Sequence, residues 1–191
     1  MAVKFIVDSA SDILPEECAA LGLYHLPMKV MFGNREYADA VDLTHREFYE
    51  KLVESDAMPT TSQIPPAEFA DAYERVTAAG DTAVVVTVSG KLSGTYQSAV
   101  IAAEDYPGKV FVVDSRNVSL GQRILILHGL TLAEQGFSAE DIARMLEYQR
   151  EKIRVMALLD TLEYLKKGGR ISAATALAGS LLSIKPVVTV D

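Results

Sequence analysis

Residues 82–88 constrain the fold of this chain more than any other stretch of its sequence. They are rich in β-branched side chains and carry no charge, which is typical of a strand that is covered on both faces. A glycine-flanked loop and a helix that starts near Ser93 are predicted to follow. A second run of the same kind, residues 110–113, leads into Asp114-Ser115. Such strands, separated by helices, favour an α/β layered fold with a largely parallel sheet.

Strands and helices are predicted to alternate along the rest of the chain. Apolar periodicity, capping residues and prolines suited to a first helical turn set their boundaries. Residues 59–66 contain too much proline for a central strand and are predicted to form a rigid loop. The other predicted strands cover 4–7, 24–32, 35–37 and 155–159, and the other predicted helices start near Pro15, Thr44, Pro66, Ser119 and Ser138.

Charge and composition argue against several classes of protein. The 191 residues carry a net charge of −8 and scattered lysines, whereas nucleic-acid binding needs a concentrated basic face. No apolar run approaches the roughly 20 residues that span a bilayer, so the chain is expected to be cytoplasmic. The single cysteine, Cys18, cannot form an internal disulfide and is expected to be a small core residue.

Three short islands combine hydroxyl or cationic side chains with backbone that allows close approach: Thr61-Ser62-Gln63, Ser93-Gly94-Thr95 and residues 168–172. Together they predict a cradle for an anionic group. None of them lies beside a histidine, a cysteine or a pair of carboxylates, which hydrolysis or acid–base chemistry would need. The sequence therefore predicts a binding protein and no catalytic residues.

Each island also has an ordinary structural explanation. Ser93 lies where a strand passes into a helix, so it can contact an anion at the helix N-terminus or simply cap the helix. Thr61 and Ser62 can donate to a carboxylate or satisfy their own backbone. Gly168 can end a short helix in the left-handed conformation, and Arg170 can then grip a phosphoryl group or lie in solvent.

Asp8 and Asp12 offer an alternative of another class. They lie four residues apart across a predicted loop, which suggests either turn and capping roles or a metal or phosphoryl-transfer pair. The three histidines are isolated, with no zinc-type spacing, and no Walker-type or dinucleotide glycine loop is present. No cofactor is therefore expected.

Six segments resemble the DegV family in both order and spacing. The resemblance covers effectively the whole chain, and it implies the fatty-acid-binding subunit of a bacterial fatty acid kinase. Such a protein buries the tail of a long-chain fatty acid and presents its carboxyl group to a partner kinase, which forms the acyl phosphate. The segments are Asp8-Ser9-Ala10-Ser11-Asp12, Thr61-Ser62-Gln63, Leu92-Ser93-Gly94-Thr95-Tyr96-Gln97-Ser98-Ala99, Asp114-Ser115, Ser119-Leu120-Gly121 and residues 162–172.

The resemblance also implies roles for individual residues. Thr61 and Ser93 would hold the fatty acid carboxyl group, with Ser62 and the Gly94 backbone close by. Arg170 would serve contact with the kinase catalytic subunit and phosphate transfer. Gly90 stands where a second serine is common in the family.

The implied architecture is a DegV domain over residues 1–191 with two α/β lobes. The N-terminal lobe would cover about 1–152 and the start of the second lobe about 153–191. Residues 184–191 form a strand-like run that stops without a turn, so we expect a shortened chain whose second lobe is incomplete. Two rivals remain at this point: an enzyme for a small phosphorylated or carboxylated substrate that uses Asp8 and Asp12, and a protein-interaction domain with an empty pocket.

Overall fold

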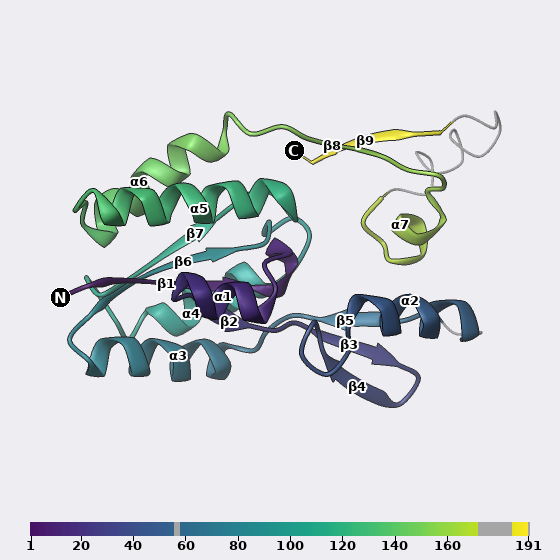
Figure 1. Ribbon diagram of the computed structural model, residues 1–191, viewed down its shortest axis with the longest axis horizontal. Coiled ribbons are helices and arrows are strands. Elements are labelled where there is room, and N and C mark those ends of the chain that lie inside the picture. The colour runs from purple at the N-terminus through teal and green to yellow at the C-terminus, as the bar shows by residue number, and fades with distance from the viewer. Residues whose placement is uncertain (56–57, 172–184, 191) are drawn as a thin grey trace.

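The computed structural model describes residues 1–55, 58–171 and 185–190, and a parallel sheet forms its centre (Figure 1). The strand order is β2-β1-β6-β7, and every neighbouring pair is parallel. This confirms the predicted α/β fold class. The strands are β1 (Val3–Asp8), β2 (Tyr24–Leu26), β6 (Thr82–Thr87) and β7 (Val110–Asp114).

Helices cover both faces of this sheet (Figure 1). On one face, α5 (Leu120–Glu134) and α6 (Ala139–Arg150) pack with α1 (Pro15–Leu21) around Phe5, Val84 and Val86. On the other, α3 (Pro66–Ala78) and α4 (Thr95–Ala103) pack around Ile6 and Val85. Successive strand residues thus alternate between two apolar layers, which explains why all six residues of β6 are buried.

The predicted helix starts follow from local chemistry. Thr44 and Glu47 form a capping box at the start of α2 (His45–Glu54), and the Ser138 side chain caps α6. Pro66 opens α3 as predicted, and one face of this helix is buried, with Phe69, Ala72, Tyr73 and Val76. Cys18 is buried on α1, as expected of a small core residue.

A second, smaller sheet extends from the main one. Its strand order is β4-β3-β5 and both pairs are antiparallel. The prediction of a loop at residues 59–66 was wrong in part, because Thr60–Ser62 forms the edge strand β5. The three paired residues lie between the prolines, and an edge strand needs hydrogen bonds on one side only. The other two strands are β3 (Lys29–Phe32) and β4 (Arg35–Ala38).

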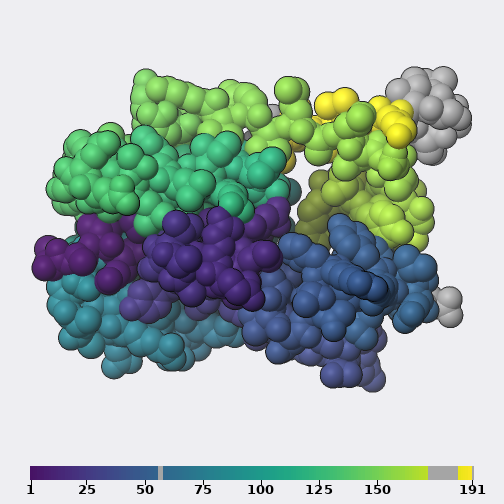
Figure 2. Space-filling model, viewed as in Figure 1, coloured from purple at the N-terminus to yellow at the C-terminus, as the bar shows by residue number. Residues whose placement is uncertain are grey.

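The C-terminal segment forms a third, two-stranded sheet. The strands β8 (Val155–Leu158) and β9 (Val187–Val190) pair antiparallel, which confirms both predicted strands for the residues described. The short helix α7 (Glu163–Lys167) precedes Arg170. Figure 2 shows the surface hollowed where this segment, the small sheet and the body of the molecule meet.

Candidate functional site

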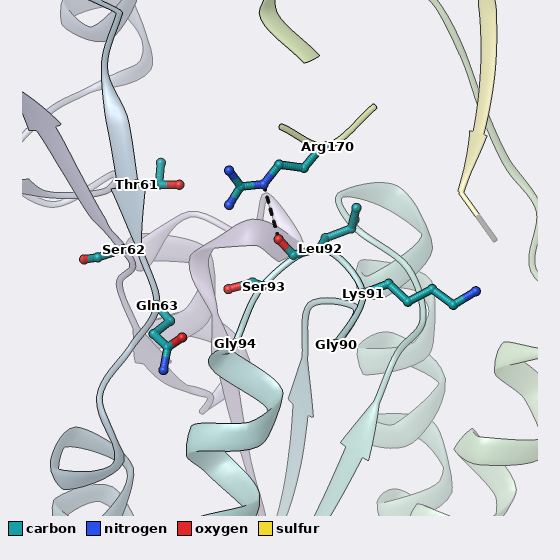
Figure 3. Close-up of a pocket in the computed structure, with 9 residues that line it drawn as sticks. All are labelled: Thr61, Ser62, Gln63, Gly90, Lys91, Leu92, Ser93, Gly94 and Arg170. Carbon is teal, nitrogen blue, oxygen red and sulfur yellow. Dashed lines mark hydrogen bonds between the residues drawn. The ribbon is translucent and has the colours of Figure 1, made fainter. Parts of the chain in front are cut away.

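The three islands of the sequence meet at one hollow of about 480 Å³ (Figure 3). It lies at the carboxyl ends of the parallel strands, where α/β sheets commonly bind ligands. One wall comes from β5, a second from the loop between β6 and α4, and Arg170 reaches in from a third side. The lining residues are Thr61, Ser62, Gln63, Gly90, Lys91, Leu92, Ser93, Gly94 and Arg170.

The β5 wall presents one hydroxyl to the hollow. Thr61 pairs with Val30 of β3, and all three residues of β5 are exposed. Side chains alternate along a strand, so neighbouring residues face opposite ways. Accordingly, the Thr61 hydroxyl points into the hollow, whereas the Ser62 hydroxyl points away from it (Figure 3). Ser62, although a lining residue, therefore has a different orientation from Thr61.

Ser93 faces Thr61 from the opposite wall (Figure 3). The helix starts later than predicted: Gly94 is the N-cap of α4 and Ser93 precedes it. The Ser93 hydroxyl oxygen still accepts a hydrogen bond from the Thr95 N–H at 3.3 Å. The N-terminus of α4 adds backbone N–H groups and the positive end of the helix dipole, which favour an anion here.

The loop that carries Ser93 folds against the buried residue Ser89. The N–H groups of Leu92 and Ser93 both donate to the carbonyl oxygen of Ser89, at 2.9 and 3.1 Å. Ser89 itself is fully buried and its N–H donates to the carbonyl of Asn117. The Gly90 N–H donates to Asp114 at the end of β7. The loop therefore has a defined shape before any ligand arrives.

Gly94 leaves room for a neighbouring side chain. A Cβ atom at this position would overlap the carboxamide oxygen of Gln63, which lies against the Gly94 backbone. The absence of a side chain thus allows β5 to approach the start of α4 closely. This close approach brings Thr61 and Ser93 to the same hollow.

Arg170 lies across the mouth of the hollow. Its Nε donates to the carbonyl of Leu92 at 3.3 Å, which connects the segment after α7 to the Ser93 loop. Gly168 was predicted to adopt the left-handed conformation, but its φ is −73° and Gly169 has φ 74° instead. The turn falls one residue later because α7 continues through Lys167 and the Gly168 N–H still bonds the Tyr164 carbonyl. Ser172, in the same island, lies outside the described residues.

Asp8 ends β1 at the carboxyl edge of the parallel sheet and is 1% exposed. Its carboxylate accepts from the N–H of Val88 at 2.7 Å, from Gln122 Nε2 at 3.0 Å and from the N–H of Ala10 at 3.1 Å. Burial raises the pKa of Asp8 to about 6, while these three hydrogen bonds act to lower it. Asp8 therefore joins β1, β6 and α5 at the carboxyl edge of the sheet.

Asp12 has a different environment. It is exposed, adopts φ 55° and accepts a hydrogen bond from the Ser119 hydroxyl. Both aspartates thus have the turn and capping roles that the sequence allowed. Within residues 1–55, 58–171 and 185–190, no group of three or more histidine, cysteine, aspartate or glutamate side chains could hold a metal ion.

Two contacts at the site were not predicted from the sequence. Gln63 Nε2 donates to the Ser98 hydroxyl at 2.9 Å, and the Ile64 N–H donates to Thr95 Oγ1 at 3.4 Å. Gln63 and Thr95 belong to the islands, but neither was assigned a role. The signal was present, since each is a polar residue within two positions of a predicted ligand-binding hydroxyl. Their partners lie more than 30 residues away in the chain, so only the fold could identify them.

A family model now identifies the group to which this chain is related. The model of the DegV family, described as uncharacterised proteins, matches residues 2–191. The chain belongs to the DegV family. A DegV domain-containing protein of Deinococcus radiodurans is 40% identical over 190 residues, which covers 100% of this chain and 68% of that relative. A second relative, from Caldanaerobacter subterraneus, is 35% identical over 98% of this chain and 67% of its own length.

Solved DegV structures share the same fold. A DegV family protein from Thermus thermophilus, described by its fatty acid binding, matches with a TM-score of 0.90 and 38% identity, over 100% of this chain and 68% of that one. DegV from Bacillus subtilis, described as a fatty acid binding protein, matches with a TM-score of 0.86 and 31% identity over the same shares. A stearic acid-binding protein from Eubacterium ventriosum gives 0.85 and 30%, over 100% of this chain and 67% of its own.

In the described part of this DegV chain, no helix is both long enough and apolar enough to cross a bilayer.

Proposed function

We propose that this DegV chain binds a long-chain fatty acid, with Thr61 and Ser93 holding the carboxyl group, and presents it to a partner kinase that forms the acyl phosphate. One observation carries the proposal: a hydroxyl from β5, a hydroxyl from the loop after β6 and the start of α4 converge on the same hollow (Figure 3). An ionised carboxylate accepts hydrogen bonds and donates none, so converging donors suit it. Relatives described as fatty acid binding proteins support the choice of ligand.

The surroundings of the hollow suit the rest of such a ligand. The sheet of β8 and β9 exposes large apolar side chains, with Met156 70%, Leu158 67% and Val187 61% exposed. Singly exposed apolar residues are ordinary, but three on one small sheet supply the kind of surface that an acyl chain covers favourably. In the proposal this sheet shields the tail.

Arg170 accounts for the kinase step of the proposal. Its guanidinium is permanently charged, exposed and positioned at the mouth of the hollow (Figure 3). A cation here stabilises the negative charge that accumulates as a phosphoryl group approaches the carboxylate. The chain itself performs no chemistry in this scheme, and the kinase catalytic subunit supplies the nucleotide.

Mass spectrometry of lipid extracted from the purified protein tests the proposal. The wild type is expected to carry a stoichiometric long-chain fatty acid, and Ser93→Ala or Thr61→Ala is expected to weaken its binding at least tenfold. A hydrogen bond to a charged group contributes about 1.5–3 kcal/mol, which sets this scale. Thr131→Ala, on the exposed side of α5, is the control. Equal retention in both site variants would contradict the assignment of the carboxyl site.

A further inference from the structure

The two hydroxyls at the hollow come from separate parts of the fold. Thr61 lies on the exposed edge of the small sheet, whereas Ser93 follows a strand of the parallel sheet. Their relative position depends on whatever joins β5 to the start of α4. Two hydrogen bonds join these parts of the chain, from Gln63 to Ser98 and from Ile64 to Thr95. Both acceptors are buried, Ser98 at 1% and Thr95 at 0% exposure.

The Thr95 hydroxyl lies between the two walls. Its Oγ1 accepts from the Ile64 N–H at 3.4 Å and lies 3.0 Å from Ser93 Oγ. A hydroxyl has one proton to donate and two sites that accept. Since Ile64 occupies an accepting site on Thr95, the Thr95 proton can be directed to Ser93 Oγ.

In this arrangement the Ser93 hydroxyl oxygen accepts two hydrogen bonds. Its Oγ accepts one hydrogen bond from the Thr95 N–H at 3.3 Å and, in this arrangement, a second from the Thr95 hydroxyl. Both accepting sites are filled, and the proton of Ser93 remains to be donated. The Ser93 hydroxyl faces the hollow, so that donation is directed at a bound ligand (Figure 3).

We propose that Thr95 is a positioning residue that holds Ser93 as a hydrogen-bond donor and thereby makes the hollow selective for a carboxylate over a neutral acyl head group. The inference rests on the proposed function, since it takes the fatty acid carboxylate as the ligand. A hydrogen bond to an ionised oxygen is roughly twice as strong as one between neutral groups. Losing the orientation of Ser93 should therefore weaken carboxylate binding more than ester binding.

Competition with a fluorescent fatty acid tests this, with laurate and methyl laurate as the competing ligands. Thr95→Val keeps the side-chain volume and removes the hydroxyl. It is expected to lower the affinity for laurate about tenfold and the affinity for methyl laurate only about threefold. Thr95→Ser, which keeps the hydroxyl, is expected to retain the wild-type ratio of the two affinities. Thr131→Val on α5 is the matched control for the substitution.

The ratio of the affinities for laurate and methyl laurate distinguishes a changed orientation of the Ser93 hydroxyl from a loss of protein stability. A variant that is merely less stable loses both ligands equally, and such an equal loss in Thr95→Val would overturn the inference, as would unchanged laurate binding. Should Thr95→Val prevent folding, Thr95→Ala and Thr95→Ser replace it as a pair, because they differ only in the hydroxyl. Wild-type protein that binds no laurate would overturn the proposed function as well, whereas wild-type binding with an unaltered ratio in the variants would overturn the role of Thr95 alone.

Discussion

The parallel sheet and the small sheet of this molecule are held together in different ways. All six residues of β6 are buried, whereas all three residues of β5 are exposed. Helices pack on both faces of the parallel sheet, but α2, the helix beside the small sheet, contains no buried residue. The hollow therefore has one wall fixed by a core and another held by a few hydrogen bonds.

Contacts among the buried Tyr37 and the partly buried Phe32 and Phe48 help to hold the small sheet. Phe32 packs edge-on against Tyr37 and Phe48, with ring centroids 6.3 and 5.7 Å apart. The Arg35 guanidinium and the Lys51 ammonium lie over the Tyr37 ring. Such pairs contribute about 1 kcal/mol each, far less than a fully buried layer. A ligand that bridges the two walls would therefore bind with a strength set by how well β5 is held.

The largest effect is expected from the core of the parallel sheet. Phe5 is 1% exposed and contacts α5 so closely that a Cβ atom at Gly129 would lie 2.6 Å from its ring. Phe5→Ala is expected to lower the free energy of unfolding by about 3–5 kcal/mol, because it leaves a cavity. Phe32→Ala in the small sheet should cost only about 1–2 kcal/mol. Urea unfolding followed by circular dichroism measures both, and equal losses would remove the distinction between the sheets.

The buried carboxylate of Asp8 gives the next effect, and it depends on pH. Its pKa is raised from 3.8 to about 6, so the native state binds this proton more tightly than the unfolded state does. The resulting stabilisation is complete below pH 3.8 and is lost as the pH rises through about 6. The amount is about 3 kcal/mol, from a shift of roughly two pKa units.

The test compares the wild type with Asp8→Asn, which does not titrate at this position. The free energy of unfolding of the wild type minus that of Asp8→Asn should fall from pH 4 to pH 7, since other groups titrate alike in both. If this value, wild type minus variant, stayed constant or rose with pH, Asp8 would not be held in the buried environment described. If pH affected the unfolding of the parallel sheet and not that of the small sheet, the contrast between the two sheets would be sharper.

The residues that the sequence predicts well are those whose chemistry acts locally. The apolar run 82–88, the capping pair Thr44 and Glu47, and the apolar face opened by Pro66 all predicted the elements that form there. In each case the interacting residues lie within one strand or helix. Local propensity and burial agree, so the prediction needs no knowledge of the fold.

The failures have the opposite origin. The edge strand β5 exists because β3 pairs with it from about 30 residues away, and proline content nearby could not reveal that partner. Which glycine after α7 adopts the left-handed conformation depends on where the last hydrogen bond of the helix forms. The sequence predicts that the three islands form one cradle, but the contact between Gln63 and Ser98 that helps to bring two of them together depends on how the small sheet lies against α4. The sequence therefore predicts which polar residues form the site, whereas tertiary contacts determine where their side chains lie.

The smallest effect comes from two helix caps that are alike in chemistry and differ in location. Thr44 caps α2 beside the small sheet, and Ser138 caps α6, which buries four residues in the main core. Thr44→Ala and Ser138→Ala should each destabilise their helix by about 1 kcal/mol. We expect Ser138→Ala to lower the global free energy of unfolding by that amount. Thr44→Ala should instead accelerate hydrogen exchange in α2 about fivefold and leave global unfolding nearly unchanged.

Each of the two variants is the control for the other, because both replace a hydroxyl that accepts from a backbone N–H near 3.2 Å. If Thr44→Ala lowered global stability as much as Ser138→Ala does, α2 and the small sheet would unfold together with the parallel sheet. The wall that carries Thr61 would then be as firmly held as the wall that carries Ser93. Hydrogen bonds between β5 and α4 would in that case matter less for ligand affinity than the exposure of β5 suggests.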